Sequence, residues 1–386
     1  MRLVSYKILI ILLLVSCKAK VKQEPIENPW GDDSDASTEL IMLTISGPDT
    51  YYEYHGHDMG ANYLLCEKLA EHLHKTVRID VCKDTLDMLE RLRNDEGDII
   101  AVPLSREHQE GFIRVANDWV VGKNSEELAR TIREWYRPQM LADIRSQEQY
   151  QLTQASVTRR VFPTMLSAAK GQISSYDHLF RKYAAVAMVD WSLLASQCYQ
   201  ESCFDPQAHS WAGACGLMQI MPSTADHLGL PREQMYQPEP NIAAASRYMR
   251  ELQIEFDDID NPSERLRFAL AAYNGGTHHV RDAMALAKKY GGVPQRWSDV
   301  RRYILLLQEA RYYNDPVVRY GYMRGSETTQ YVDMIMQRHS QYRQALATGT
   351  KVRSVVAPTR VAPTTTASPL EATPHRATRK NKWRKE

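Results

Sequence analysis

In this 386-residue sequence, the residue that most clearly suggests chemistry is a glutamate at a position where an apolar side chain is expected. The segment 191–201, WSLLASQCYQE, has the spacing of an amphipathic helix, with Trp191, Leu194 and Cys198 on one apolar stripe. Glu201 is the next position on that stripe, so its carboxyl is predicted to enter a poorly hydrated environment. Loss of hydration disfavours the charged form and raises the pKa of a carboxyl. A carboxyl still protonated near neutral pH can donate its proton to a leaving-group oxygen as a general acid.

The same placement also has a purely structural explanation. Buried carboxylates that pair with an arginine or cap a backbone amide are common, and periodicity alone does not separate the two interpretations. Two-carboxylate glycosidases would need a second acid close by. Asp205 precedes a proline and Asp226 has the spacing of an exposed helix position, so neither matches the inward placement of Glu201. The sequence therefore predicts a mechanism with one carboxylate.

Four short motifs occur in order along the chain. They are Glu201-Ser202, the run 210–222 (SWAGACGLMQIMP), the run 272–276 (AYNGG) and the run 327–332 (ETTQYV). Each motif alone is weak evidence, but four of them in this order form a specific pattern. Together they resemble the soluble lytic transglycosylase family, which has a lysozyme-like helical fold. The resemblance covers about residues 173–346.

The resemblance implies a role for each matching residue. Glu201 corresponds to the catalytic acid, which protonates the β-1,4 oxygen leaving N-acetylmuramic acid. As a carboxylate it would then accept the proton of that sugar's C6 hydroxyl, which gives a 1,6-anhydro ring. Tyr331 corresponds to the tyrosine that orients the glutamate, and Gly275 stands where the family more often has alanine, a difference expected to matter little. The positions that the resemblance places at the substrate are Ser210, Met218, Gln219, Met221, Tyr273, Asn274 and Tyr331. Met218 and Met221 would have the same apolar pattern if they packed in the core instead.

The residues themselves support several of these roles. Tyr273 continues an apolar helical stripe, so its ring is expected to pack inward with a hydroxyl that needs a partner. The pair 275–276, Gly-Gly, is expected to end that helix. Gly213 and Gly216 are expected to let the backbone approach a bulky sugar closely.

A helical domain is expected to position these residues. Residues 138–346 have helical periodicity almost throughout, and Asp190 stands where the N-cap of the Glu201 helix is expected. Residues 39–137 instead alternate strand and helix patterns, which predicts a small α/β lobe with a parallel or mixed sheet. The expected fold class is α+β multidomain, with an all-α lysozyme-like catalytic domain after the α/β lobe.

The α/β lobe resembles the first lobe of amino-acid-type periplasmic solute-binding proteins. In those proteins a second lobe is inserted after a strand such as 98–102, and the two lobes clamp a ligand. Only residues 105–112 are available for that insertion here, so a structural or docking role is expected rather than solute binding. Such a lobe before the catalytic motifs resembles the layout of the membrane-bound lytic murein transglycosylases.

The N-terminus is predicted to direct export. Residues 1–17 combine basic residues with a short apolar run and read as a signal peptide. The run 14–17, LVSC, resembles a lipobox, which makes Cys17 the lipidated residue; a cleaved secretory signal with an incidental cysteine is the alternative. Lys18 after the cysteine favours, by analogy, the outer membrane facing the periplasm.

The remaining composition narrows the function classes. Residues 18–38 are expected to form a polar tether, and residues 347–386 a disordered, Pro/Thr-rich basic tail. A formal net charge of +1 gives no indication of a nucleic-acid partner.

Histidines paired as His-x-His at 55–57 and 72–74 are expected to be solvated, so neither a metal nor a cofactor is expected. Among five cysteines after Cys17, Cys203 and Cys215 are candidate disulfide partners, whereas Cys198 is expected in the core.

The leading hypothesis is a lipid-anchored peptidoglycan lytic transglycosylase for cell-wall remodelling or turnover. It would cleave the β-1,4 bond between N-acetylmuramic acid and N-acetylglucosamine in glycan strands and leave 1,6-anhydro ends. A goose-type lysozyme-like hydrolase of the same bond is the enzymatic alternative. A non-catalytic wall-binding or solute-sensing lipoprotein is the other, although the intact acid motif argues against it.

Overall fold

The computed structural model describes residues 38–153 and 156–348. Within them the chain forms two compact units, one made of residues 38–45 and 64–137 and the other of residues 46–63 and 138–348. The predicted signal peptide with Cys17, the tether and the basic tail lie outside the described residues. The mixture of a sheet unit and a mostly helical unit confirms the α+β class.

A five-stranded mixed sheet forms the centre of the first unit. Its strands, in spatial order, are β4 (Thr76–Val81), β1 (Glu39–Thr44), β5 (Ile99–Ile100), β7 (Val120–Val121) and β6 (Ile113–Arg114). Strand β1 runs parallel to β4 and β5, whereas β7 is antiparallel to β5 and β6. The helices are α1 (Ala61–His72), α2 (Thr85–Arg93) and α3 (Glu126–Trp135), with short 3-10 turns at Glu107–Gln109 and Ala116–Asp118. The likeness of this unit to a solute-binding lobe stays a prediction.

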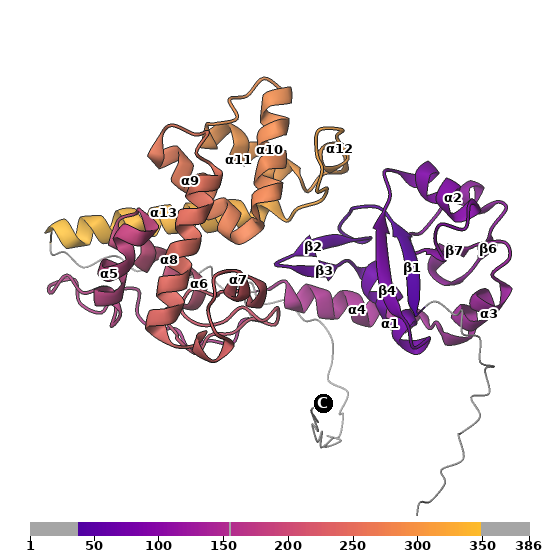
Figure 1. The fold of residues 1–386 in the computed structure, drawn as a ribbon, viewed down its shortest axis with the longest axis horizontal. Helices are drawn as coiled ribbons and strands as arrows, with labels where there is room; N and C mark the ends of the chain where they lie inside the picture. The colour runs from indigo at the N-terminus through magenta and orange to yellow at the C-terminus, as the bar shows by residue number, and fades with distance from the viewer. Residues whose placement is uncertain (1–37, 154–155, 349–386) are drawn as a thin grey trace, which may run out of the picture. The chain divides into compact units, whose positions relative to one another are not determined.

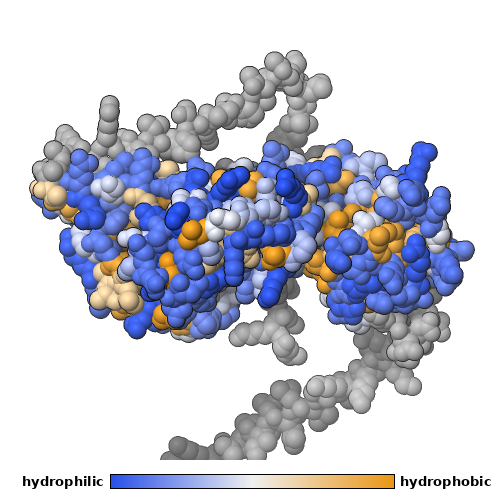
Figure 2. Space-filling view, turned by 90° about the horizontal axis from the view of Figure 1, so that it is seen from above, coloured by the Kyte–Doolittle hydropathy of each residue, from blue (hydrophilic) through white to orange (hydrophobic). Residues whose placement is uncertain are grey.

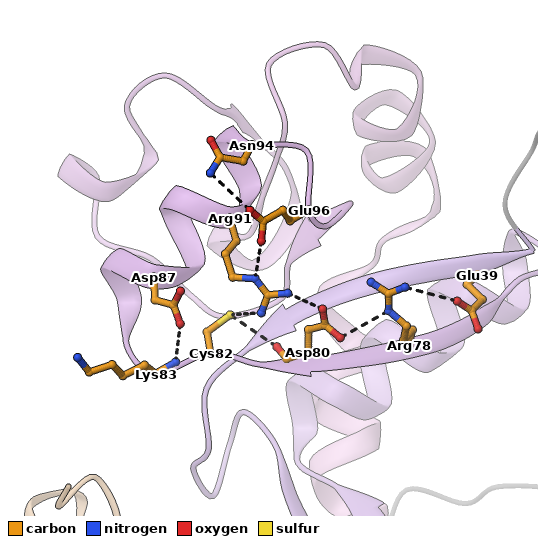
Figure 3. Close-up of polar contacts among 9 residues, drawn as sticks. All are labelled: Glu39, Arg78, Asp80, Cys82, Lys83, Asp87, Arg91, Asn94 and Glu96. Carbon is orange, nitrogen blue, oxygen red and sulfur yellow. Dashed lines mark hydrogen bonds and ion pairs between the residues drawn. The ribbon is translucent and has the colours of Figure 1, made fainter.

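Charged side chains cover the outer edge of this sheet, at strand β4 (Figure 3). Arg91 on α2 donates hydrogen bonds to Asp80 Oδ2 at 2.6 Å and to Glu96 Oε2 at 3.2 Å. Arg78 lies 3.5 Å from Asp80 and 3.9 Å from Glu39. Partly exposed pairs of this kind stabilise by at most about 1 kcal/mol each. Their larger effect is to discourage another strand from pairing with the open edge.

Helices make up most of the second unit (Figure 1). They are α4 (Pro138–Gln151), α5 (Asp177–Ala187), α6 (Trp191–Ser202), α7 (Pro222–His227), α8 (Pro238–Glu255), α9 (Pro262–Gly275), α10 (Thr277–Lys289), α11 (Trp297–Leu306), α12 (Ala310–Tyr313) and α13 (Gly325–Thr348), with a 3-10 turn at Arg232–Gln234. One continuous apolar core joins α5, α6, α8, α9, α10, α11 and α13. Helix α9 is central, because it packs against α8, α10, α11 and α13.

A β-hairpin from far upstream also belongs to the second unit. Strands β2 (Tyr52–Tyr54) and β3 (His57–Met59) pair antiparallel. The two turn residues His55 and Gly56 have positive φ angles of 50° and 72°, as in the two-residue turn that matches the twist of a hairpin. The limits of 39–137 expected for the α/β lobe include this hairpin, which in the structure packs with the helices.

The expected disulfide between Cys203 and Cys215 is not formed. Both are free thiols, as are the other cysteines of the described residues. Cys203 is buried at the end of α6, whereas Cys215 is partly exposed and its thiol donates to the carbonyl of Gly213 at 3.2 Å. Cys198 is fully buried in the core, as predicted.

The visible face of the molecule is mainly hydrophilic, with hydrophobic residues in small scattered groups (Figure 2). This distribution is ordinary for a folded chain in water. Across the ranges that the structure describes, none of the helices combines the length and the apolar character needed to cross a bilayer.

Candidate active site

Three helix ends bring the predicted site residues together. Glu201 lies in the last turn of α6, Asn274 in the last turn of α9 and Tyr331 in the second turn of α13. Helix α13 packs against both α6 and α9, so these positions converge although 130 residues separate Glu201 from Tyr331.

Both ends of α6 are fixed by local chemistry. Asp190 caps the N-terminus, as predicted, with its carboxylate accepting the backbone N–H of Ser192 at 2.9 Å. The helix stops at Cys203 and Phe204, whose φ angles of 52° and 65° are left-handed. Glu201 therefore sits at the negative end of the helix dipole, which disfavours a charged carboxylate.

The converging residues line a cavity of about 350 Å³. Those expected from the sequence are Glu201, Ser210, Gln219, Met221, Tyr273, Asn274 and Tyr331. Met218 is the exception, because its side chain is 1% exposed and packs in the core. Its contribution is the backbone carbonyl, which accepts the hydroxyl of Tyr273 at 2.8 Å. Of the two alternatives that the sequence left open for Met218, core packing is the one found.

Glu201 has the electrostatics of an acid that keeps its proton. Burial raises its pKa to about 8, and the negative charge of Glu327 acts in the same direction. Two groups oppose this: the hydroxyl of Tyr331 donates to Glu201 Oε1 at 2.5 Å, and Arg159 brings a positive charge. Desolvation prevails, so Glu201 is predominantly protonated at neutral pH.

Tyr331 is itself held in place, which lets it orient the acid. Gln197, which is fully buried in α6, donates from Nε2 to the Tyr331 hydroxyl at 3.3 Å. The Tyr331 hydroxyl thus has a donor on one side and the carboxyl of Glu201 on the other. Because Tyr331 donates to Oε1, Oε2 is the oxygen left to carry the acidic proton toward a ligand.

Replacing Tyr331 with phenylalanine is expected to raise the pKa of Glu201 further, because a hydrogen bond that lowers it is lost. The alkaline limb of the pH–activity profile should move to higher pH, and turnover should fall about tenfold from the loss of orientation. The profile of kcat/KM against pH measures both effects. If the rate fell while the alkaline limb of the kcat/KM profile stayed at the same pH, Tyr331 would have only a packing role.

The Gln219 side chain stiffens the loop that forms one wall. Its backbone is left-handed, with φ 46°, which is costly for a non-glycine residue. Its Nε2 donates to the carbonyls of Ala208 at 3.1 Å and Gly216 at 2.9 Å. These bonds use the amide Nε2 of Gln219, which also lines the cavity.

Ser210 and the two glycines of the same loop differ in what they do. The Ser210 hydroxyl accepts the backbone N–H of Ala214 at 3.0 Å, so its own proton can go to a ligand. Gly216 makes a close approach, but not to a sugar: a Cβ there would lie 2.4 Å from the carbonyl oxygen of Met235. Gly213 has a φ of 87°, and a Cβ there would lie 3.4 Å from Pro222 Cγ, an ordinary contact. The expected close backbone approach therefore serves packing at Gly216.

Gly275 has a larger role than the sequence indicated. The Thr328 hydroxyl donates to Asn274 Oδ1 at 2.8 Å and orients that amide at the cavity. A Cβ on Gly275 would lie 2.6 Å from Thr328 Oγ1 and 2.3 Å from Met323 Cε. The alanine typical of the family thus does not fit here without moving Thr328.

Gly275→Ala is accordingly expected to lower the free energy of unfolding by about 1–3 kcal/mol, the usual cost of overpacking. Thermal unfolding followed by circular dichroism measures the change. Adding Met323→Leu, which removes the Cε atom that the new Cβ would meet at 2.3 Å, should recover part of the loss. A melting temperature equal to that of the wild type would mean that the pocket around Gly275 adapts freely.

A second carboxylate, Glu327, lies in the same cavity, contrary to the expectation of a single one. Burial would raise its pKa, but His55, the hydroxyl of Tyr54 and the charge of Arg324 together hold the pKa below its usual range. Glu327 is thus ionised whereas Glu201 is protonated. The signal was present in the sequence, since Glu327 precedes Tyr331 by four residues and shares its helix face.

The other lining residues that the sequence did not indicate include Tyr54, His55, Arg159, Gln200, Trp211, Arg324 and Gln330. His55 and His57, which were expected to be solvated, have specific partners. His55 Nε2 lies 3.6 Å from Glu327 Oε1, and His57 Nε2 lies 2.7 Å from the carbonyl oxygen of Ala212. In the ranges with assigned structure, no three His, Cys, Asp or Glu side chains are grouped to hold a metal ion.

Part of the chain that forms this site is similar to proteins of a known family. Residues 178–293 match the family model of the transglycosylase SLT domain. Membrane-bound lytic murein transglycosylase F of Desulfosudis oleivorans is 42% identical over 176 residues, which are 46% of this chain and 38% of that protein. Its namesake from Yersinia pestis is 42% identical over 172 residues, 45% of this chain and 34% of that protein. The chain thus spans well under half the length of these curated relatives.

A solved structure gives a weaker likeness. The 70 kDa soluble lytic transglycosylase of Escherichia coli is 26% identical, with a TM-score of 0.29 over 44% of this chain and 24% of that one. The resemblance to soluble and membrane-bound lytic transglycosylases that the motifs indicated is confirmed by the family model and the curated relatives. The segment 178–293, which holds Glu201, Gln219 and Tyr273, is similar to the transglycosylase SLT domain.

Proposed function

We propose that this protein is a peptidoglycan lytic transglycosylase. It cleaves the β-1,4 bond between N-acetylmuramic acid and N-acetylglucosamine, leaves 1,6-anhydro ends and serves cell-wall remodelling or turnover. The observation that carries the proposal is the protonated Glu201, which accepts a hydrogen bond from Tyr331, lines a cavity and lies in the segment similar to an SLT domain.

The chemistry follows from the state of Glu201. Its Oε2 proton passes to the glycosidic oxygen as the bond between that oxygen and C1 of N-acetylmuramic acid breaks. The N-acetylglucosamine side of the strand then leaves, and the C6 hydroxyl that reacts next belongs to the same N-acetylmuramic acid. The carboxylate then accepts the proton of the C6 hydroxyl as the C6 oxygen bonds to C1, and Glu201 returns to its acid form. Because the C6 hydroxyl belongs to the same sugar, its attack gains from proximity by several kcal/mol relative to a free water.

The second carboxylate does not favour the hydrolytic alternative. Both oxygens of Glu327 accept the hydroxyl of Tyr54, at 2.9 and 3.0 Å, and Arg324 Nε lies 3.5 Å away. A carboxylate so well satisfied, with a lowered pKa, is a weak base. Activation of water by Glu327 is therefore disfavoured, and the intramolecular hydroxyl remains the better nucleophile.

Digestion of purified cell wall tests the proposal. Mass spectrometry of the released muropeptides should find 1,6-anhydro ends, which are lighter than reducing ends by one water. Reducing ends alone would identify a hydrolase of the goose-lysozyme type. No fragments at all would leave a wall-binding protein.

The site of action is proposed to be the cell envelope, with a lipid on Cys17 as the anchor in the outer membrane. The support is the lipobox-like run 14–17 and the membrane-bound relatives. Cys17→Ser should abolish labelling by a radioactive fatty acid and release the protein from the membrane fraction. Retention of both label and membrane association would refute the assignment of Cys17.

A further inference from the structure

The β2–β3 hairpin divides the groove that contains Glu201. A second cavity of about 260 Å³ adjoins the first one. The residues that line both are Tyr54, His55, Met221, Tyr273, Asn274, Arg324 and Glu327. The second cavity is further lined by the rest of the hairpin tip, Glu53 and Gly56. The tip of the hairpin thus lines both of these adjoining cavities, which are here called the two halves of the groove.

The base of the hairpin is anchored to the helical unit. Glu148 Oε1 on α4 accepts both the hydroxyl of Tyr52 and the backbone N–H of Gly60, each at 3.1 Å. The ring of Tyr52 also meets that of Tyr322 edge-on, with centroids 5.1 Å apart. Tyr52 is 4% exposed and Glu148 8% exposed, so this attachment is shielded from water.

The tip of the hairpin contacts both walls of the groove. The ring of Tyr54 stacks on Trp211, in the loop after α6, with centroids 6.3 Å apart and planes within 3°. On the other side the guanidinium of Arg324 lies 5.8 Å from the Tyr54 ring, and the Tyr54 hydroxyl reaches Glu327 on α13. With His57 bonded to the loop as well, the tip is a fixed bridge.

We propose that this hairpin closes one side of the catalytic groove and restricts cleavage to the ends of glycan strands, with Tyr54 and His55 as specificity-determining residues. The inference rests on the proposed function. Cleavage within a strand requires saccharides to lie continuously on both sides of Glu201, and a bridge from wall to wall interrupts that path. The half that contains Glu201, at about 350 Å³, is at the small end of ligand pockets and suits a short terminal segment.

The experiment is a time course on peptide-free glycan strands, with the length and the end group of each product read by chromatography and mass spectrometry. The wild type should release disaccharide-sized fragments from the first minutes while long strands shorten gradually. Tyr54→Ala with His55→Ala should raise the share of long fragments among the early products several-fold. This share is independent of total rate, so a slower variant remains informative.

Two controls accompany the double variant. Tyr54→Phe keeps the stack on Trp211 and should retain the disaccharide-sized products. Leu86→Ala changes a side chain that is 68% exposed on α2 and should leave the length distribution and the rate unchanged. Circular dichroism melts identify folded variants.

The outcomes separate the inference from the proposed function. Early long fragments from the wild type overturn the inference by themselves, even if the double variant does not fold. A folded double variant with the wild-type length distribution overturns it too. Reducing ends on disaccharide-sized fragments contradict the lytic transglycosylase chemistry while supporting end-specific cleavage, because end groups and lengths are read independently.

Discussion

Glu201→Gln should lower peptidoglycan turnover by about 10²–10⁴-fold, the range that a general acid contributes. The amide has nearly the same shape and fits beside Tyr331, but it has no acidic proton for the glycosidic oxygen and cannot later accept one from the C6 hydroxyl. Binding of purified cell wall should persist, because the other residues that line the cavity are unchanged. Release of soluble muropeptides measures turnover, and sedimentation with insoluble wall measures binding.

A matched control is available on the surface. Glu233→Gln makes the same chemical change at an exposed position in the 3-10 turn Arg232–Gln234 and should leave turnover at the wild-type rate. If Glu201→Gln retained wild-type turnover, the acid would have to be another group, and Glu327 would be the next residue to test. Equal losses in both variants would point to a defect in preparation rather than in chemistry.

The same substitution should stabilise the protein at alkaline pH. The pKa of Glu201 is about 8 in the folded state, against an ordinary value of 4.5. Between these values the folded state binds more protons than the unfolded state, so the free energy of unfolding falls as pH rises. The contribution is fully present below about pH 4.5 and is lost as pH approaches 8. Glutamine does not titrate, so the variant should exceed the wild type by up to a few kcal/mol at pH 8.

Chemical denaturation at a series of pH values measures this difference. Activity should follow the same titration, because only the protonated acid starts cleavage: kcat/KM should fall as pH rises through about 8. Parallel stability curves for wild type and variant from pH 5 to pH 8 would mean that Glu201 is already ionised in the fold. The proposed mechanism would then lose its proton donor.

Local patterns were sufficient to predict the helix that carries the acid. Asp190 as N-cap and the apolar stripe ending at Glu201 depend only on neighbouring residues, and both predictions agree with the structure. Tyr331 was identified through a motif, since nothing local links it to a residue 130 positions earlier. For Met218 the sequence could not choose between the cleft and the core, because one apolar pattern describes both, and its side chain packs in the core.

The position of the β2–β3 hairpin beside the site could not be predicted from local sequence patterns. Tyr54 precedes Glu327 by 273 positions. The sequence around Tyr54 has strand and turn patterns, which do not indicate that it packs against distant helices. Its role depends on how the chain returns to the groove, which short-range periodicity does not encode. Gly275 likewise depends on Thr328, a residue of another helix that fills the space a methyl group would need.

The path of the chain has a practical consequence for dissecting the protein. The backbone passes between the two units after residue 45, after residue 63 and after residue 137, because the segment 46–63 belongs with the helices. If a protease cuts the chain near residue 137, the two fragments should remain associated, because residues 46–63 of the N-terminal fragment pack with the helices of the C-terminal fragment. A recombinant fragment that starts at residue 138 would lack Tyr54 and His55, so its cleavage pattern would show how the site acts without the hairpin.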